Sequence, residues 1–426
     1  MKVIVLNDHL YPDGGADVVA LSAAEGCAAI GLDVTLFVGD TIRTDDHTPR
    51  RARVVSAGQH DLLRNPNRVQ AAVQGFWNPQ SARLLREVLS QHRPQDTIVH
   101  LHSWTKSLSA SVVRATLDAG FSLVLTLHEY FTVCPNGMLF NYQSGQKCGQ
   151  RPMSLGCLST SCDARKGLHK IYRVVRHGFQ TQWGQLPRGI EHAVVVSRYS
   201  EQLLRPWLPQ GMQFHHIRNP IEVPMLPAAP VAHNQGFVQV GRLFLPKNQS
   251  QFLQACSMAG VQGTCVGDGP DLPELQAQFP SAHFTGPLNR PDVIAQISQS
   301  RALVMPSLWD ETQGLVCAEA AALGVPSVIY DRCAAVDFVQ HERNGLVVPS
   351  GNVTQLAQAL RRLADEPELA QRLGTQARTD FWRDAPTPER HAQELAALYE
   401  RILQQRSMAR SPDTMPLPHA TRSIDP

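Results

Sequence analysis

Short apolar runs alternate with helical stretches along most of the chain, and this alternation limits the folds that the sequence can adopt. In the first half the runs are rich in Val, Ile and Leu and nearly unbroken: Val3–Leu6, Val34–Val38, Thr97–His102, Leu123–Leu127 and Ala193–Val196. Helical stretches such as Asp17–Ile30 and Leu108–Ala119 lie between them. Strands that are apolar along their whole length are typical of parallel sheets covered by helices on both faces. The first half therefore predicts a doubly wound α/β sheet.

The second half repeats the pattern. Its expected strands are Phe237–Val240, Gly263–Val266, Ala302–Met305, Ser327–Tyr330 and Gly345–Val348. Its expected helices are Asn248–Met258, Leu272–Gln278, Asp292–Ser300, Gln313–Leu323, Val353–Ala364 and Pro367–Thr379. The chain of 426 residues also exceeds the roughly 250–300 residues over which one hydrophobic core usually extends. We therefore expect two Rossmann-like doubly wound domains that face each other across a cleft.

The boundaries follow from composition. The stretch 224–235 contains three prolines and small residues, which suits a linker, so the expected domains are 1–223 and 236–385. A C-terminal helix is expected over 386–405. The tail 406–426 has four prolines and little apolar content, and it is expected to be disordered.

Overall composition excludes several classes of protein. Hydrophobic residues make up 43% and charged residues 18% of the chain, which argues against a mainly disordered protein. The net charge of +2 gives no global field that would attract nucleic acid. No apolar run reaches the 18 or so residues that span a bilayer, and the N-terminal run is expected to be a strand rather than a signal peptide. A cytoplasmic enzyme is the resulting expectation.

A pair of glutamates follows the strand Ala302–Met305. Glu311 lies in the loop and Glu319 within the next helix, about 12 Å apart if the segment is mostly helical. Between them, the backbone N–H groups around Thr312, Gln313, Gly314 and Leu315 would form an anion site at a helix N-terminus. This geometry suits a nucleotide sugar, with its sugar at Glu311, its diphosphate at the amides and its ribose at Glu319. The alternative is a helix-terminal charge at Glu311 and a solvated Glu319.

Other candidate residues also follow expected strands. Arg242 and Lys247 come after Phe237–Val240 and could hold phosphate oxygens, or could be solvated loop cations. Gly267 and Asp268 begin a tight turn that could border a nucleotide base. Gly14 and Gly15 follow the first strand and would let a phosphate or sugar approach the backbone, or would simply form a turn. Because G-x-G-x-x-G does not occur in the chain, we do not expect NAD.

Two histidines stand at strand ends. His102 ends one expected strand and His128 follows another. Ligands in such sheets bind beyond the carboxyl ends of the strands. Each histidine is therefore a candidate for function, although a buried histidine is often only a hydrogen-bonded core residue.

Taken together, these motifs resemble a retaining glycosyltransferase of the family 4 type, with two facing Rossmann-like domains (the GT-B fold). The resemblance extends to about Gln404, and its most specific part is Glu311-x7-Glu319 followed by Gly324-Val325-Pro326. The motifs at Gly14-Gly15, Gly241-Arg242 with Lys247, Gly267-Asp268-Gly269-Pro270 and Asn344-Gly345-Leu346 occur in the expected order. Two departures concern the donor pocket: Gln313 stands where many members have an aromatic residue, and Cys333-Ala334 where a Gly pair is common.

The resemblance implies roles for individual residues. Arg242 and Lys247 would hold the diphosphate, Glu319 the ribose hydroxyls and Glu311 the donor sugar. His128 would lie beside the sugar and the β-phosphate, and His102 is assigned to the acceptor side. No metal would be required at the diphosphate, because the helix dipole and the two cations carry its charge.

The implied activity is transfer of a sugar, with retained configuration, from a nucleoside diphosphate sugar to a saccharide or lipid-linked acceptor. Uridine is the first expectation for the nucleoside and guanosine the second, and the products would be surface polysaccharides or glycolipids. Nucleic acid is not expected as a partner. The alternatives are a nucleotide-sugar epimerase of the same fold and a catalytically silent scaffold.

A basic segment suggests a membrane surface. Residues Arg165 to Arg188 include six Lys or Arg and no acid, while Leu168, Ile171, Val175, Phe179 and Trp183 recur at helical spacing. Such a helix can lie on an anionic membrane, here at the inner face of the cell membrane. The alternative is a helix whose apolar stripe packs on the sheet and whose basic side is solvated.

Four of the nine cysteines gather within one loop, 134–162: Cys134, Cys148, Cys157 and Cys162. Their spacing lacks the CxxC pair of most zinc ribbons. Structural zinc or an iron–sulfur cluster bound by converging thiolates is the leading expectation, with disulfides and plain thiols as alternatives. The other five, Cys27, Cys256, Cys265, Cys317 and Cys333, are expected in the core.

Overall fold

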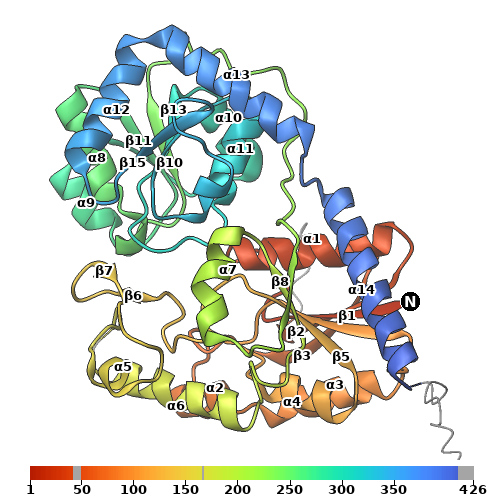
Figure 1. Ribbon diagram of the computed structural model, residues 1–426. Helices are drawn as coiled ribbons and strands as arrows, with labels where there is room; N and C mark the ends of the chain where they lie inside the picture. Colours follow the sequence, from red (N-terminus) through yellow and green to blue (C-terminus); the bar gives the residue numbers. More distant parts are fainter. Residues whose placement is uncertain (42–48, 166, 411–426) are drawn as a thin grey trace, which may run out of the picture.

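The computed structural model describes residues 1–41, 49–165 and 167–410. It contains two parallel sheets, each with helices on its faces (Figure 1). The first sheet has the strand order β3-β2-β1-β4-β5-β8-β9. Its strands are β1 Lys2–Asn7, β2 Asp33–Asp40, β3 Arg53–Gln59, β4 Thr97–Leu101, β5 Ser122–Thr126, β8 His192–Val195 and β9 Gln213–His216. The helices of this half are α1 Gly15–Ala29, α2 Arg68–Phe76, α3 Pro79–Leu89, α4 Ser111–Asp118, α5 Leu155–Ser159, α6 Leu168–Gln182 and α7 Arg198–Leu204.

The second sheet has the order β12-β11-β10-β13-β14-β15. Its strands are β10 Phe237–Val240, β11 Gly263–Val266, β12 His283–Gly286, β13 Ala302–Met305, β14 Ser327–Tyr330 and β15 Gly345–Val348. The helices that accompany it are α8 Gln249–Ala259, α9 Leu272–Gln278, α10 Arg290–Ser298, α11 Leu315–Leu323, α12 Val353–Asp365 and α13 Pro367–Arg383. The predicted fold class, two doubly wound parallel sheets, is confirmed.

Three strands of the two parallel sheets escaped prediction, and all three are edge strands. β3 and β9 form the two edges of the first sheet, and β12 forms one edge of the second. Their sequences, RVVSAGQ, QFHH and HFTG, mix polar and apolar residues and are partly exposed. An edge strand is covered on fewer sides than a central one, so it lacks the continuous apolar run by which the central strands were recognised.

The C-terminal helix returns to the first sheet. Helix α14, Pro388–Arg410, runs down beside α1 (Figure 1). Its buried residues join the core over β1 and β2: Ala392, Leu395, Leu398, Tyr399 and Ile402. The Tyr399 hydroxyl lies 2.6 Å from His100 Nδ1. The expectation that the chain is disordered from residue 406 is wrong for 406–410, which continue the helix; residues 411–426 lie outside the described part.

The stretch between the sheets is anchored to the second one. Ala229 and Val231 are buried in its core, and the Ala229 N–H donates to the Leu323 carbonyl over 2.9 Å. The segment 224–235 is therefore attached to the second domain at Ala229 and Val231.

Candidate functional site

The loops after β10 and β13 lie side by side because the two strands are neighbours in the sheet. Lys247 follows β10 and Glu311 follows β13. Lys247 Nζ lies 2.6 Å from Glu311 Oε1, and the Ser307 hydroxyl donates to the same oxygen over 2.6 Å. The two charged side chains are mostly buried. A buried pair of this kind offers a cation for phosphate and a carboxylate for sugar hydroxyls at one point.

Helix α11 begins directly after this pair. Gly314 caps it with φ of 77°, and a Cβ there would lie 3.1 Å from Met305 Cε and 3.2 Å from Ala335 Cβ. The first N–H groups of α11 lie where the sequence predicts an anion site. Anion binding there stays a prediction. Glu319 is buried on this helix, and Arg290 Nη2 lies 3.1 Å from its Oε1. Burial raises the pKa of Glu319, while Arg290 opposes the shift. The alternative of a solvated Glu319 is therefore wrong.

The remaining donor-side candidates surround this point. Arg242 is exposed at the end of β10, with its guanidinium carbon 5.9 Å from the centre of the Phe244 ring. Gly267 has φ of 131°, and a Cβ on it would lie 2.2 Å from the Gly241 carbonyl oxygen, so only glycine fits. The carbonyl of Asp268 accepts from the Leu243 N–H over 2.9 Å. Gly267 and Asp268 thus brace the loop that carries Arg242.

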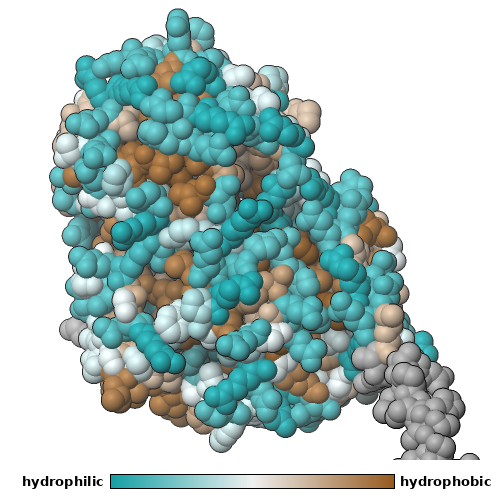
Figure 2. Space-filling model, in the orientation of Figure 1, coloured by the Kyte–Doolittle hydropathy of each residue, from teal (hydrophilic) through white to brown (hydrophobic). Residues whose placement is uncertain are grey.

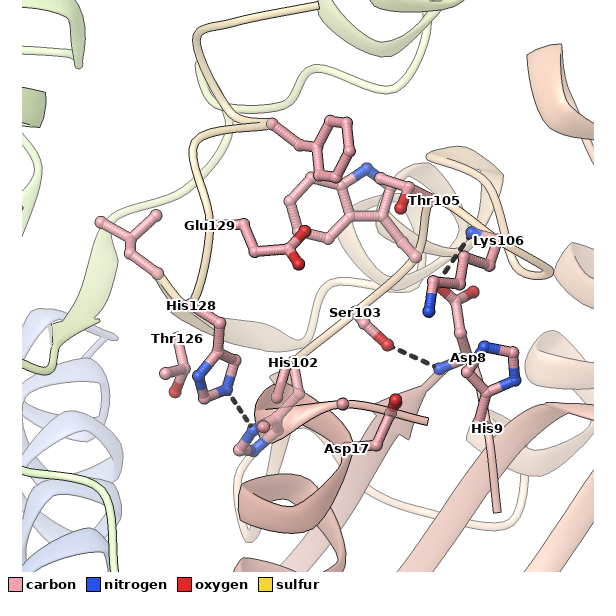
Figure 3. A pocket seen from close by; sticks show the side chains of 16 residues that line it. Asp8, His9, Asp17, His102, Ser103, Thr105, Lys106, Thr126, His128 and Glu129 are labelled. Carbon is pink, nitrogen blue, oxygen red and sulfur yellow. Dashed lines mark hydrogen bonds between the residues drawn. The ribbon is translucent and has the colours of Figure 1, made fainter. Parts of the chain in front are cut away.

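A pocket opens at the carboxyl ends of β1, β4 and β5 (Figure 3). Gly14 and Gly15 line it at the start of α1, and His102 and His128 line it from β4 and β5. The rest of the lining is Asp8, His9, Ala16, Asp17, Ser103, Trp104, Thr105, Lys106, Thr126, Leu127, Glu129 and Phe131. The pocket therefore combines aromatic rings with acids, a lysine and backbone groups, as expected of a site for a polar organic ligand.

The two predicted histidines meet in this pocket. His102 Nδ1 lies 2.9 Å from His128 Nε2 (Figure 3). Burial lowers the pKa of His128 to about 3 and that of His102 well below its usual range. Both rings are therefore neutral at pH 7. One of the two facing ring nitrogens carries a proton and donates it in a hydrogen bond to the other. His102 Nε2 is buried and has no hydrogen-bond partner among the described residues.

Charged residues that the sequence reasoning missed line the same pocket. Burial raises the pKa of Asp17 to about 6 and also raises that of Glu129. Burial disfavours the charged form of His9, but the hydrogen bond to Asp40 and nearby acids raise its pKa overall. Lys106 Nζ lies 2.7 Å from Asp13 Oδ2. Asp8 directly follows β1, and Glu129 lies shortly after the end of β5. This position after a strand is the signal in the sequence by which both acids could have been identified as candidate site residues.

The pocket adjoins the donor-side loop. The Thr312 hydroxyl donates to the His128 carbonyl over 3.0 Å, and the Gln313 side chain accepts from the Asn219 N–H over 3.0 Å. A Cβ on Gly15 would lie 3.3 Å from Leu315 Cδ1. Helices α1 and α11 thus point their N-termini toward the same space. The structure thus brings the predicted glycines and histidines of the first sheet close to the loop that carries Glu311, whereas Glu319 lies further along α11 beside Arg290.

Further side chains tie the two halves together and were not predicted. The Tyr130 hydroxyl donates to the Asp310 carbonyl over 2.8 Å, and the Tyr199 hydroxyl to the Asp310 carboxylate over 2.5 Å. Lys147 pairs with the same carboxylate. Lys147 lies on β7 (Gln146–Lys147), which forms a hairpin with β6 (Phe140–Asn141) inside the cysteine-rich loop. This loop is therefore an inter-domain contact.

The four cysteines of that loop do not form the expected cluster of converging sulfur atoms. Within residues 1–41, 49–165 and 167–410, only His9, Asp13 and Asp17 form a group of possible metal ligands whose atoms all lie within 4.8 Å of one another. Lys170 Nζ instead lies 3.1 Å from Cys162 Sγ and 3.8 Å from Cys157 Sγ. Cys134 is buried, Cys148 is half-buried, and all four are free thiols. Metal binding by this loop stays a prediction.

Comparison with known families matches both halves of the chain. The family described as "Glycosyl transferase 4-like domain" matches residues 14–220. The family described as "Glycosyl transferases group 1" matches residues 232–380. The first match includes the pocket residues from Gly14 to Phe131, and the second includes Arg242, Lys247 and the two glutamates.

Individual relatives agree with these families. The GDP-mannose-dependent alpha-mannosyltransferase of Mycolicibacterium smegmatis is 31% identical over 252 residues, covering 59% of this chain and 57% of the relative. The O-antigen chain mannosyltransferase C of Escherichia coli is 22% identical, covering 96% of this chain and all of the relative. Several other relatives match over shorter stretches, and the chain spans between 19% and 40% of the length of three of them.

Solved structures resemble nearly the whole fold. Sucrose-phosphate synthase from Thermosynechococcus elongatus has a TM-score of 0.69 at 19% identity, covering 95% of this chain and 99% of the other. Anabaena HepE in complex with UDP-glucose has a TM-score of 0.66 at 15% identity, covering 94% and 100%. The chain therefore carries a glycosyl transferase 4-like domain followed by a glycosyl transferases group 1 domain, joined in a GT-B fold.

Proposed function

We propose that the protein transfers a sugar from a nucleoside diphosphate sugar to a hydroxyl of a saccharide or lipid-linked acceptor. The observation that carries the proposal is the buried Lys247–Glu311 pair at the N-terminus of α11, adjoining the pocket of His102 and His128. The Lys247 side of this arrangement suits a diphosphate. The pocket of His102 and His128 suits a ligand with several hydroxyl groups.

The donor would lie along α11. Its diphosphate would contact Lys247, Arg242 and the first N–H groups of the helix, which supply positive charge without a metal ion. Its sugar would reach Glu311, and its ribose would reach Glu319. Uridine and guanosine are both candidates for the nucleoside: HepE has been solved with UDP-glucose, and the M. smegmatis relative is named as GDP-mannose-dependent.

The acceptor would enter the pocket beneath His128. Trp104 and Phe131 offer apolar faces for a sugar ring, and Glu129 and Asp17 offer acceptors for its hydroxyls. In a retaining front-face transfer, the acceptor oxygen bonds to the anomeric carbon as the bond to the diphosphate oxygen breaks. The leaving diphosphate takes the acceptor proton. The products would belong to surface polysaccharides or glycolipids, as the name of the E. coli O-antigen relative suggests.

The donor is tested first by thermal unfolding with uridine and guanosine diphosphate sugars. A donor at 100 times its dissociation constant should stabilise the protein by about 2.7 kcal/mol. The transfer assay then pairs that donor with saccharide acceptors, and NMR of the product gives the anomeric configuration. An unchanged midpoint with every donor would favour the silent scaffold. Conversion of the donor sugar without an acceptor would favour the epimerase.

Two substitutions separate the roles of the glutamates. Glu319→Ala should weaken donor binding by the roughly 1.5–3 kcal/mol of a hydrogen bond to a charged group. Glu311→Ala should instead lower turnover, on the order of a hundredfold, if this carboxylate orients the sugar in the transition state. Dissociation constants and kcat are measured for both, with the exposed Glu368→Ala as the control. Equal and small effects of the first two changes would contradict the assignment.

A further inference from the structure

Helix α6 turns its polar side toward the protein. Lys170 is buried beside two sulfur atoms, as described above. Arg173 pairs with the buried Asp163 over 2.9 Å and donates to the Asn136 carbonyl. Arg176 donates to the Thr105 carbonyl over 3.2 Å. The expectation that these cations face solvent or lipid is therefore wrong, because the loops beneath α6 supply carbonyl and carboxylate partners for them.

The apolar side of α6 faces outward instead. Leu168 is 81% exposed and Ile171 61% exposed, and Val175 and Trp183 are exposed on the same stripe. The alternative in which this stripe packs on the sheet is wrong for these residues. Exposed leucine and isoleucine at helical spacing are costly in water, and contiguous apolar surface of this kind usually marks a binding site.

Two neighbouring helices extend the stripe. The Phe76 ring of α2 lies 4.7 Å from the Tyr172 ring and 5.5 Å from the Phe179 ring of α6, and Cys157 of α5 adjoins Lys170. Both helices, and Leu63 in the loop before α2, expose large apolar residues. We call the set the apolar face: Leu63, Val69, Val73, Leu155, Leu158, Leu168, Ile171, Val175 and Trp183. Figure 2 shows apolar surface at its lower left edge, over α5 and α6.

The charge around the apolar face has one sign. No acid occurs between Leu62 and Arg86, and the only acid between Tyr130 and Arg188 is the buried, ion-paired Asp163. Arg68, Arg151 and Arg165 are exposed on these segments. A basic rim around exposed aliphatic and aromatic side chains is complementary to an anionic bilayer surface.

The apolar face is also the outer surface of the pocket wall. The Gln180 side chain of α6 accepts from Trp104 Nε1 over 3.1 Å and donates to the Phe131 carbonyl over 2.9 Å. The Arg176 guanidinium carbon lies 5.2 Å from the centre of the Phe131 ring. One helix thus contacts the pocket on its inner side and presents apolar residues on its outer side.

We propose that the apolar face docks the protein on an anionic lipid bilayer, with α6 lying in the interface and Arg68, Arg151 and Arg165 contacting lipid headgroups. No described helix is both long and apolar enough to span a bilayer, and the proposed attachment is peripheral. Docking brings the pocket to the membrane surface, where a lipid-linked acceptor would present its saccharide.

The test is co-sedimentation of the full chain with vesicles of phosphatidylglycerol and phosphatidylcholine, and with vesicles of phosphatidylcholine alone. The protein should bind the anionic vesicles, and the bound fraction should fall as salt is raised, because exposed charges are screened beyond about 10 Å at 0.1 M. The double variant Leu168→Ser, Ile171→Ser should bind at least about tenfold less, because two apolar side chains no longer enter the interface.

The matched control changes two exposed methionines away from the apolar face, Met225→Ser and Met258→Ser, and should bind like the unaltered protein. Both variants should keep the thermal unfolding midpoint and its shift with donor, since the changed residues are exposed. Equal vesicle binding by both variants would overturn the proposal. So would a dimer in light scattering that Leu168→Ser, Ile171→Ser dissociates without any vesicle binding, because a second copy would then cover this face.

Discussion

At the scale of single residues, the contact between Lys247 and Glu311 links donor binding to the electrostatics of the free protein. The pair is mostly buried, and Glu311 also accepts from Ser307. A diphosphate would take over part of the Lys247 charge when it binds. Glu311 would then be free to accept a hydroxyl of the donor sugar, so occupancy of the phosphate site would prepare the sugar site.

Removing one partner of this pair should destabilise the free protein. Lys247→Met leaves a buried carboxylate with only Ser307, at an expected cost of about 1–3 kcal/mol in the free energy of unfolding at pH 7. The double variant Lys247→Met, Glu311→Gln should recover most of this cost, because no uncompensated charge remains. Urea unfolding of the two single variants and the double variant measures the coupling. Strictly additive effects would contradict the pairing.

The positions of Arg242, Lys247 and Glu311 in loops after strands were predictable from the sequence, because β10 and β13 are short and mostly apolar runs. Their roles toward a donor stay predictions. The Lys247–Glu311 contact was not predictable, since it depends on two strands far apart in sequence becoming neighbours. The pocket acids were missed for the same reason. Asp17 lies in the first turn of α1 and Glu129 lies shortly after the end of β5, and the two line one pocket only because α1 begins where β5 ends, at one edge of the sheet.

At the scale of elements, α14 completes a core that begins at the other end of the chain. Leu398→Ala should cost about 2–5 kcal/mol of stability, because it leaves a cavity beside the buried residues of the first sheet. The exposed Glu400→Ala on the same helix is the control and should change little. Chemical denaturation monitored by tryptophan fluorescence measures both. Similar small effects would mean that α14 contributes little to the first sheet.

Periodicity located α6 but did not determine its orientation. The sequence shows an apolar stripe and a basic stripe, and either can face inward. The basic stripe faces inward here because the loops after β4 and β5 present carbonyl groups, Asp163 and thiols to it. Those partners come from an irregular segment for which the sequence gives no three-dimensional arrangement.

At the scale of the whole molecule, buried neutral histidines predict sensitivity to acid. Burial lowers the pKa of His128 to about 3 and those of His177 and His391 to about 4, from an ordinary value of 6.5. Between these values the unfolded chain binds more protons than the native one, so stability is lost as the pH falls below 6.5. Each histidine should cost roughly 2 kcal/mol by about pH 5.

The raised pKa of Asp17, about 6, acts in the opposite sense, because its protonation favours the native state as the pH falls. Burial also raises the pKa of Glu129, Asp271 and Glu319. More histidines have a lowered pKa than acids have a raised one, since His100, His102, His192 and His215 are lowered as well. The urea midpoint should therefore fall steadily from about pH 6.5 to 4.5. His177→Gln, which lies outside the pocket, should reduce the slope. A midpoint that stays constant over this range would contradict the prediction.

The return of α14 to the first sheet affects how the protein is made. A ribosome releases the strands of the first sheet early, but Leu395, Leu398 and Tyr399, which complete one face of that sheet, emerge only after the whole second sheet has been synthesised. At about 5–20 residues per second, the second half of the chain takes on the order of ten seconds or more to synthesise. During that interval the nascent first domain exposes apolar surface over β1 and β2. Chaperones that shield nascent chains should therefore bind it until α14 arrives.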